Sequence, residues 1–324
     1  MTGLIWPTWR QHRAAYLLLL ALACAAGAWA VWQHHVLVTD IRVYGETCTR
    51  NDGCHPGEEV PGGARFVQDQ AHTALRWLPP VIGVFLGAPL FAQDLESGTH
   101  RLAWTQSWSR QRWIATKLAT AGLVVSLGAL LLTVPVTWWW HSIRAGRAGD
   151  GDTGAAWRAA TPQTDWSYLP YTGPAGIAHL LLALAAGAAV GLLLRRLLPA
   201  VAVSAAVVAG LQLALDRVRP HLLPATIRRH ADPATPEPLV NGWHLGQGFV
   251  RSDGSLFTTP KSIPCEGESW EEYARCQGIT GSYSRDLRPS QFLPLQWMET
   301  GICLGAAALL VALCLWWVRR ITTQ

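Results

Sequence analysis

The chain has 324 residues, of which 50% are hydrophobic and only 15% are charged, and its mean hydropathy is +0.17. Disordered tails, coiled coils and nucleic-acid-binding modules carry more charge and fewer long apolar runs, so these classes are excluded. The net charge of +5 comes mostly from Arg residues in pairs beside apolar stretches, not in one cluster, so we expect no nucleic-acid partner. The 18 Trp residues favour a membrane protein, which places indole rings at the headgroup level.

Six stretches are long enough to span a bilayer, which takes about 20 mostly apolar residues. They cover about residues 14–32, 75–92, 114–138, 176–194, 197–215 and 298–318. The second stretch is interrupted by Pro79 and Pro80. The fold class predicted is therefore an all-α integral membrane protein in which residues 1–324 form a single six-helix transmembrane domain.

Before the first span, Trp6 and Trp9 are interleaved with Arg10 and Arg13. This pattern predicts a short amphipathic helix in the inner membrane interface, the alternative being a flanking peptide. Residues 28–30 resemble a signal-peptidase site, but the apolar run is too long for a signal peptide, so it is kept as a span.

The short connections between spans decide the orientation, because they carry an excess of cations. These are Arg10 and Arg13, then Arg101, Arg110, Arg112 and Lys117, then Arg195 and Arg196, and finally Arg319 and Arg320. All fall on one side of the membrane, which the positive-inside rule makes cytoplasmic, so both termini are expected in the cytoplasm. The localisation expected is the plasma membrane of a bacterial cell, with the chain as a multi-pass protein. The outer segments are then 35–73, 141–175 and 217–296.

We expect the segment 217–296 to form a small extracellular cap with turns and short strands. This cap could gate substrate release, bind a ligand or serve as a stabilising lid. Four Cys residues lie in the outer segments, two in each of two segments. We expect the disulfides Cys48–Cys54 and Cys265–Cys276, with pairing between the segments and free thiols as the alternatives. Cys24, Cys303 and Cys314 lie within spans.

The spans are almost bare of ionisable residues, which ion-driven transporters and intramembrane hydrolases keep at membrane depth. Asp94, Asp216 and Glu299 lie at span ends and His179 lies near an outer end, where a satisfied or snorkelling residue is expected. No phosphate-binding loop, catalytic motif or metal-binding set is found. We therefore expect no catalytic, cofactor or metal site in this chain.

Three spans carry pairs of Gly residues four positions apart, a spacing that lets helix backbones approach closely. The pairs are Gly83 with Gly87, Gly187 with Gly191, and Gly301 with Gly305. Together they predict tight helix packing within one chain or between two.

The inner segment after the second span is polar and dense in charge. It contains Glu96-x-Gly98-Thr99, then Arg101-Leu102, then Ser109-Arg110 with Arg112-Trp113, and it leads to Lys117. Gly98 can end one helix and Thr99 can cap the next, so a short amphipathic helix across the inner membrane face is expected. Such a helix suits docking to a soluble partner.

In this segment, and in its six-span layout, the chain resembles the transmembrane permeases of type 2 ABC exporters, particularly small actinobacterial ones. Many relatives carry Pro where residues 105–107 stand here. The resemblance implies a coupling helix that fits a groove in a separate ATPase subunit, with two permease chains, identical or different, and two ATPases forming the transporter. It implies that Glu96, Gly98, Thr99, Arg101, Ser109 and Arg110 transmit ATPase closure to the spans. ATP and Mg²⁺ would bind the partner only.

The function expected is export of an amphipathic or hydrophobic substrate, such as a drug, antibiotic, peptide or lipid, because the spans are apolar and rich in Trp and small residues. In a drug or antibiotic exporter this would confer resistance. One alternative is a membrane-embedded sensor or scaffold whose cap binds a ligand. Another is an intramembrane enzyme, which would need polar catalytic groups that the spans lack. The charged loop residues can also be explained by solvation or by binding anionic lipid.

Overall fold

The computed structural model describes residues 2–50, 64–98, 109–161, 166–231, 239–258 and 270–320. The chain divides into two compact units. One comprises Met1–Arg217 together with Gln296–Gln324, and the other comprises Val218–Leu295. The first unit is helical, whereas the second contains a small β-sheet.

Six helical stretches among the described residues are long and apolar enough to cross a membrane. They are Arg13–Tyr44, Gln70–Ser97, Arg110–Arg147, Gly173–Leu194, Leu197–His221 and Pro289–Arg319. Each overlaps one stretch expected from the sequence, and most extend further. The reason is that hydropathy marks only the part suited to hydrocarbon, whereas the backbone hydrogen bonds of a helix continue through polar residues.

The first helix, α1, runs without interruption from Thr2 to Arg50. The amphipathic N-terminal stretch is therefore helical, as expected, and continuous with the first span, which begins at Arg13; that it lies in the membrane interface remains a prediction. No Gly or Pro stands between Trp9 and Arg13 to end a helix there. Residues 35–50, which were expected to begin the outer segment 35–73, also belong to α1.

The second span combines three helical pieces: α2 (Ala64–Ile82), the π-helical turn η2 (Gly83–Gly87) and α3 (Pro89–Ser97). Pro79 and Pro80 lie inside α2. The irregular turn comes later, where the Ala88 N–H donates to the Gly83 carbonyl over 2.8 Å. Pro89 follows directly and has no N–H for the regular helical pattern, so a wider turn before it accommodates the ring.

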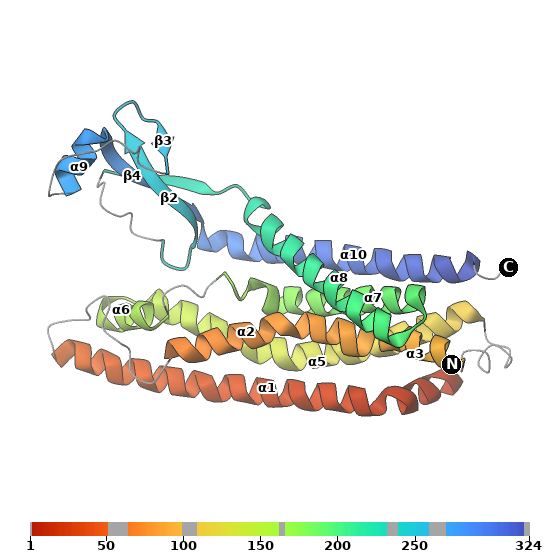
Figure 1. Ribbon diagram of the computed structural model, residues 1–324. Helices are drawn as coiled ribbons and strands as arrows, with labels where there is room; N and C mark the ends of the chain where they lie inside the picture. Colours follow the sequence, from red (N-terminus) through yellow and green to blue (C-terminus); the bar gives the residue numbers. More distant parts are fainter. Residues whose placement is uncertain are drawn as a thin grey trace. The chain divides into compact units, whose positions relative to one another are not determined.

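α7 (Gly173–Leu194) contacts α2, η2, α3 and α5. In its most apolar window 72% of the residues are buried, against 17% in the span that contains α8 (Leu197–Val218), so α7 is the central helix and α8 is peripheral. α5 (Arg110–Arg147) lies along both α1 and α7 (Figure 1). The other elements are α6 (Gly151–Ala160), η3 (Leu169–Tyr171) and α10 (Phe292–Arg320).

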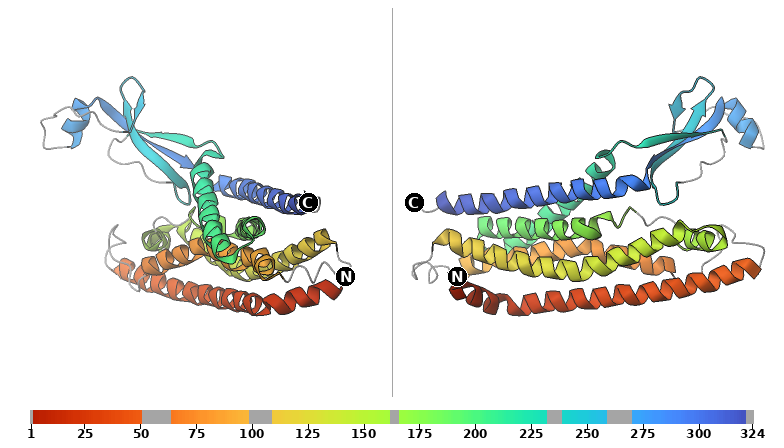
Figure 2. Two further views of the ribbon diagram at one scale, coloured as in Figure 1. Left: turned by 45° about the vertical axis from the view of Figure 1, so that its right-hand side comes forward. Right: turned by 180° about the vertical axis from the view of Figure 1, so that it is seen from behind.

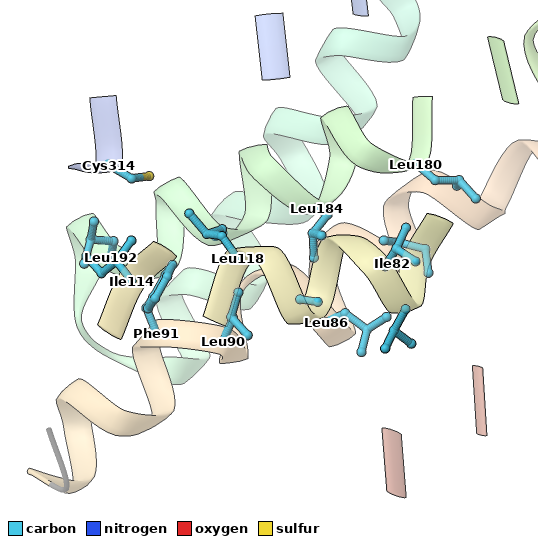
Figure 3. Close-up of a cluster of buried hydrophobic side chains, with 14 of the residues drawn as sticks. Ile82, Leu86, Leu90, Phe91, Ile114, Leu118, Leu180, Leu184, Leu192 and Cys314 are labelled. Atoms are coloured by element: carbon cyan, nitrogen blue, oxygen red, sulfur yellow. The ribbon is translucent and has the colours of Figure 1, made fainter. Parts of the chain in front are cut away.

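A buried cluster of aliphatic and aromatic side chains joins these helices (Figure 3). It includes Leu90 and Phe91 of α3, Ile114 and Leu118 of α5, and Leu184 of α7. In a water-soluble protein, burial of each Leu, Ile or Phe side chain stabilises the fold by about 1.5–3 kcal/mol. In a bilayer the stabilisation comes instead from close packing, because lipid is as apolar as these side chains. Small residues at helix contacts therefore matter as much as large ones.

Two of the three Gly pairs expected from the sequence lie against each other. A Cβ added to Gly187 would collide with the Gly83 carbonyl, and one added to Gly87 would lie 2.8 Å from the Leu184 carbonyl oxygen. A Cβ at Gly191 would collide with the Ala88 carbonyl. The backbones of η2 and α7 therefore approach as closely as these glycines allow.

The third pair behaves differently. No heavy atom of the described residues lies within 4 Å of a Cβ added to Gly301 or Gly305 of α10. The small face of α10 is therefore open in the single chain, and packing at this pair remains a prediction about a second chain.

The second unit contains a four-stranded antiparallel sheet in the order β1-β4-β2-β3. This confirms the short strands expected in residues 217–296, although the all-α fold class was wrong for this part of the chain. The strands are β1 (Thr226–His230), β2 (Trp243–Arg251), β3 (Leu256–Phe257) and β4 (Ile279–Leu287). Figure 2 shows the sheet with the short helix α9 (Trp270–Cys276). The 3₁₀ turns η4 (Arg219–His221) and η5 (Pro289–Gln291) complete the unit. That it forms an extracellular cap remains a prediction.

Asp286 on β4 is the polar centre of this sheet. Its carboxylate is buried and accepts hydrogen bonds from Ser284 Oγ at 2.7 Å, His244 Nδ1 at 2.9 Å and Arg228 Nη2 at 3.1 Å. Burial alone would raise the pKa of Asp286, but these hydrogen bonds and the Arg228 charge outweigh burial and lower the pKa below its ordinary value. The carboxylate therefore ties β1 and β2 to the central strand.

Candidate functional site: the segment between α3 and α5

The residues expected to contact an ATPase lie around the connection between α3 and α5. Glu96 is in the last turn of α3, and Gly98 ends that helix with a left-handed φ of 75°, a conformation that glycine adopts without strain. Ser109 is the N-cap of α5, where its Oγ accepts a hydrogen bond from the Arg112 N–H at 3.3 Å. Arg110 is the first residue of α5. Thr99 and Arg101, and the coupling helix expected there, lie outside the described residues.

Glu96 connects α3 to the start of α8. Its Oε2 accepts a hydrogen bond from the backbone N–H of Leu197 at 2.7 Å, and Leu197 is the first residue of α8. A carboxylate at a helix N-terminus satisfies an otherwise unpaired N–H and interacts favourably with the helix dipole. Glu96 is thus held by a neighbouring span, a contact that the sequence did not reveal.

A buried ion pair lies next to this segment. Lys117 of α5 donates from Nζ to Asp94 Oδ2 of α3 and to the Leu90 carbonyl oxygen, the latter at 3.1 Å. The side chains of Lys117 and Asp94 are 2% and 7% exposed, so both charges are almost fully removed from solvent. Lys117 Nζ also lies 5.1 Å from the centre of the Trp113 ring.

One partner of this pair precedes the segment 98–109 and the other follows it. The pair therefore links the two helices that the segment connects. Separating a buried pair leaves an uncompensated charge in a low dielectric, which is far more costly than breaking an exposed pair. α3 and α5 are therefore held together at the ends of the segment. The sequence assigned Asp94 to a span end and Lys117 to the inner charges, but it did not pair them.

A signal for the role of Lys117 was nevertheless present. Trp113, Ile114, Lys117, Leu118 and Ala121 recur at helical spacing, and all are buried. A single lysine inside an apolar helical stripe must have a partner when it is buried. Asp94 was the acidic residue nearest the end of the preceding span.

A second buried polar group lies between α7 and α10. His179 Nε2 is 3.2 Å from Glu299 Oε1, and the two side chains are 5% and 1% exposed. The Nδ1–H of His179 donates to the Ala175 carbonyl at 2.9 Å, and Cys303 Sγ lies 3.8 Å from Nε2. Glu299 therefore does not snorkel. Its carboxylate is paired inside the protein with His179, a partner that sequence reasoning did not identify.

The predicted disulfides are not tested by the described residues. Cys54 and Cys265 lie outside them, and Cys48 and Cys276 are in the last turns of α1 and α9. Cys24, Cys303 and Cys314 are free thiols within spans. Within the described part of the chain, no group of three or more His, Cys, Asp or Glu side chains is placed to hold a metal ion.

Comparison with known proteins gives one match. The family model described as ABC-2 membrane transporter related matches residues 18–219. This range contains the second, third and fourth spans, nearly all of the first and fifth, and the whole segment between α3 and α5. No curated protein and no solved structure matches the chain.

Proposed function

The chain belongs to the ABC-2 membrane transporter related family, and from this premise we propose that it is the permease subunit of an ABC exporter. A separate ATPase subunit would bind and hydrolyse ATP, and the segment between α3 and α5 would be its docking site. The permease itself would then need no catalytic residue or cofactor. The termini and this segment would face the cytoplasm, as the cations beside the short connections indicate.

The proposal is carried by the Asp94–Lys117 pair at the base of the segment. A partner that pushes on residues 98–109 pushes on both α3 and α5, because the buried pair keeps the two helix ends from separating. The contact between Glu96 and Leu197 extends the same movement to α8. Three spans would therefore respond together to closure of the ATPase.

Such a response is useful only if the partner binds two states of the permease with different affinity. ATP-bound, closed ATPases would favour one arrangement of the three spans and nucleotide-free ATPases the other. Glu96, Gly98, Thr99, Arg101, Ser109 and Arg110 would make the contacts that differ. A second permease chain would complete the pathway, and the open small face at Gly301 and Gly305 is one place for it to pack.

The test uses the full chain co-expressed with candidate ATP-binding-cassette ATPases of the same organism and reconstituted in nanodiscs. We expect the ATPase to co-purify with the permease and its hydrolysis rate to depend on the permease. Replacing Glu96 and Arg101 together by Ala should abolish that dependence without loss of membrane insertion. The matched control is Arg229→Ala with Asp253→Ala, which removes one acid and one base from exposed positions of the second unit.

Full coupling in the Glu96→Ala/Arg101→Ala variant would contradict the role of the segment. Failure of any ATP-binding-cassette protein to bind the wild-type chain would contradict the permease assignment and favour a sensor or scaffold. Uphill transport by the permease reconstituted alone would contradict the need for a separate ATPase.

A further inference from the structure

The first unit contains a pocket between three of its spans. It is lined by α1 between Ala26 and Gln33, by α2 between Ala71 and Leu78, and by α5 between Leu132 and Trp139. We name it the Trp139 pocket. Its volume is about 130 Å³. A cavity of about 150 Å³ lined by aliphatic side chains holds a benzene molecule, so the Trp139 pocket suits a single ring or a short stretch of alkyl chain.

The lining is apolar apart from three side chains with hydrogen-bonding groups, those of Trp29, Gln33 and Trp139. The indole Nε1–H of Trp139 is buried and has no hydrogen-bond partner among the described residues. Gln33 is also buried, at only 8% exposed, and its amide can both donate and accept, whereas Trp29 is 37% exposed. A buried donor without a partner costs about 1–3 kcal/mol, which a ligand with an acceptor oxygen would recover.

None of the lining side chains is charged. A charged group entering this pocket would lose its hydration without an ionic partner, so the pocket disfavours ions. The part of a ligand that enters must therefore be neutral, with an apolar body and one or two acceptor atoms.

The surrounding surface indicates how such a ligand reaches the pocket. Trp32 of α1, Trp77 of α2 and Trp138 of α5 are 60%, 64% and 44% exposed, and each lies on the same stretch of helix as lining residues. Exposed Trp residues of membrane proteins gather at the boundary between hydrocarbon and headgroups. The pocket therefore lies at the depth where amphipathic molecules in a bilayer hold their ester and amide groups.

We propose that the Trp139 pocket binds the ring or alkyl segment of a neutral amphipathic molecule whose ester or amide carbonyl oxygen accepts hydrogen bonds from Trp139 and Gln33. The molecule would enter sideways from the bilayer. That this molecule is also the one transported rests on the proposed function. Its binding does not, because the pocket is formed by this chain alone.

The experiment measures binding of 4-fluorobenzyl acetate to the full-length chain in nanodiscs by ¹⁹F NMR, with empty nanodiscs to subtract partition into lipid. We expect saturable binding that Ala30→Leu removes, because Ala30 is 5% exposed and lines the pocket. Ala28→Leu is the matched control: it adds the same atoms two residues away at an exposed position of α1, and binding should persist.

The polar contact is tested by Trp139→Phe, which keeps an aromatic ring but removes the N–H. The ester probe should bind about tenfold more weakly, the effect of losing a hydrogen bond worth about 1.4 kcal/mol. 1-Butyl-4-fluorobenzene, which has no acceptor oxygen, should bind the variant as well as it binds the wild type. This pair of probes remains informative if Ala30→Leu fails to fold.

A comparison of lipids separates two sources of the same chemistry. If a resident lipid ester occupies the pocket, the probe should bind more tightly in nanodiscs of ether lipids than in those of ester lipids. Equal binding in both would indicate that the pocket is free for an added compound.

Saturable binding that survives in Ala30→Leu, or equal loss of both probes in Trp139→Phe, would overturn the proposal. No ATPase takes part in these measurements. Failure of binding therefore leaves the permease assignment standing, and failure of ATPase coupling leaves the binding site standing.

Discussion

The buried Asp94–Lys117 pair gives the sharpest prediction about what holds α3 and α5 together. Lys117→Met keeps most of the side-chain length but removes the charge, which leaves the Asp94 carboxylate buried without its cation. Breaking a buried pair in this way costs about 3–5 kcal/mol, and Asp94→Leu should cost a similar amount. The double variant removes both charges, so it should fall within about 1–2 kcal/mol of the wild type.

The chain provides an exposed pair as a matched control. Arg76 and Asp216 lie 3.9 Å apart with side chains 54% and 42% exposed. Arg76→Met and Asp216→Leu should each cost no more than about 1 kcal/mol through the ion pair, because water replaces the lost partner.

The assay is the unfolding free energy of the full chain in mixed micelles titrated with SDS, followed by far-UV circular dichroism. A double-mutant cycle for the buried pair should give a coupling energy of several kcal/mol, against at most about 1 kcal/mol for the exposed pair. Equal coupling energies for the two pairs would refute the argument. So would a Lys117→Met variant as stable as the wild type.

Two further predictions concern helix packing and the sheet. Gly187→Ala should destabilise the chain by about 1–3 kcal/mol, because its Cβ collides with the Gly83 carbonyl and the helices must separate. Gly301→Ala, which meets no described atom within 4 Å, should be neutral or stabilising in SDS unfolding of the monomer; a greater loss there than at Gly187 would contradict the packing. For the sheet, the lowered pKa of Asp286 means that its carboxylate contributes stability above its ordinary pKa of about 4, and that this contribution is lost as pH falls through the lowered folded-state value. The difference in melting temperature between the wild type and Asp286→Asn should therefore shrink on acidification below pH about 4, and a difference that grows would contradict the sign.

The close approach of η2 and α7 illustrates what spacing reveals and what it leaves open. Gly83 with Gly87 and Gly187 with Gly191 are visible as small-residue pairs, but so is Gly301 with Gly305. Only the fold distinguishes them, because a glycine pair permits a close contact and does not choose its partner. The choice depends on which helix faces which.

The polar residues show the same division. Asp94, Lys117, His179 and Glu299 lie far apart in sequence, and each alone has the appearance of a helix-end residue that reaches water. Their pairing depends on the rotation of α5 against α3 and of α10 against α7, which hydropathy does not encode. The sequence likewise does not show that the Trp139 N–H, surrounded by three helices, is buried without a hydrogen-bond partner among the described residues.

The sequence alone determined that this is a membrane protein with six spans, because the length and apolarity of a spanning helix are local properties imposed by the bilayer. It also indicated the family, through a short charged segment in a characteristic place. The tertiary structure alone decided that α1 is continuous, that β1, β2, β3 and β4 pair into one sheet, and which charges are buried together. These depend on contacts between residues distant in the chain, whose energies no local pattern contains.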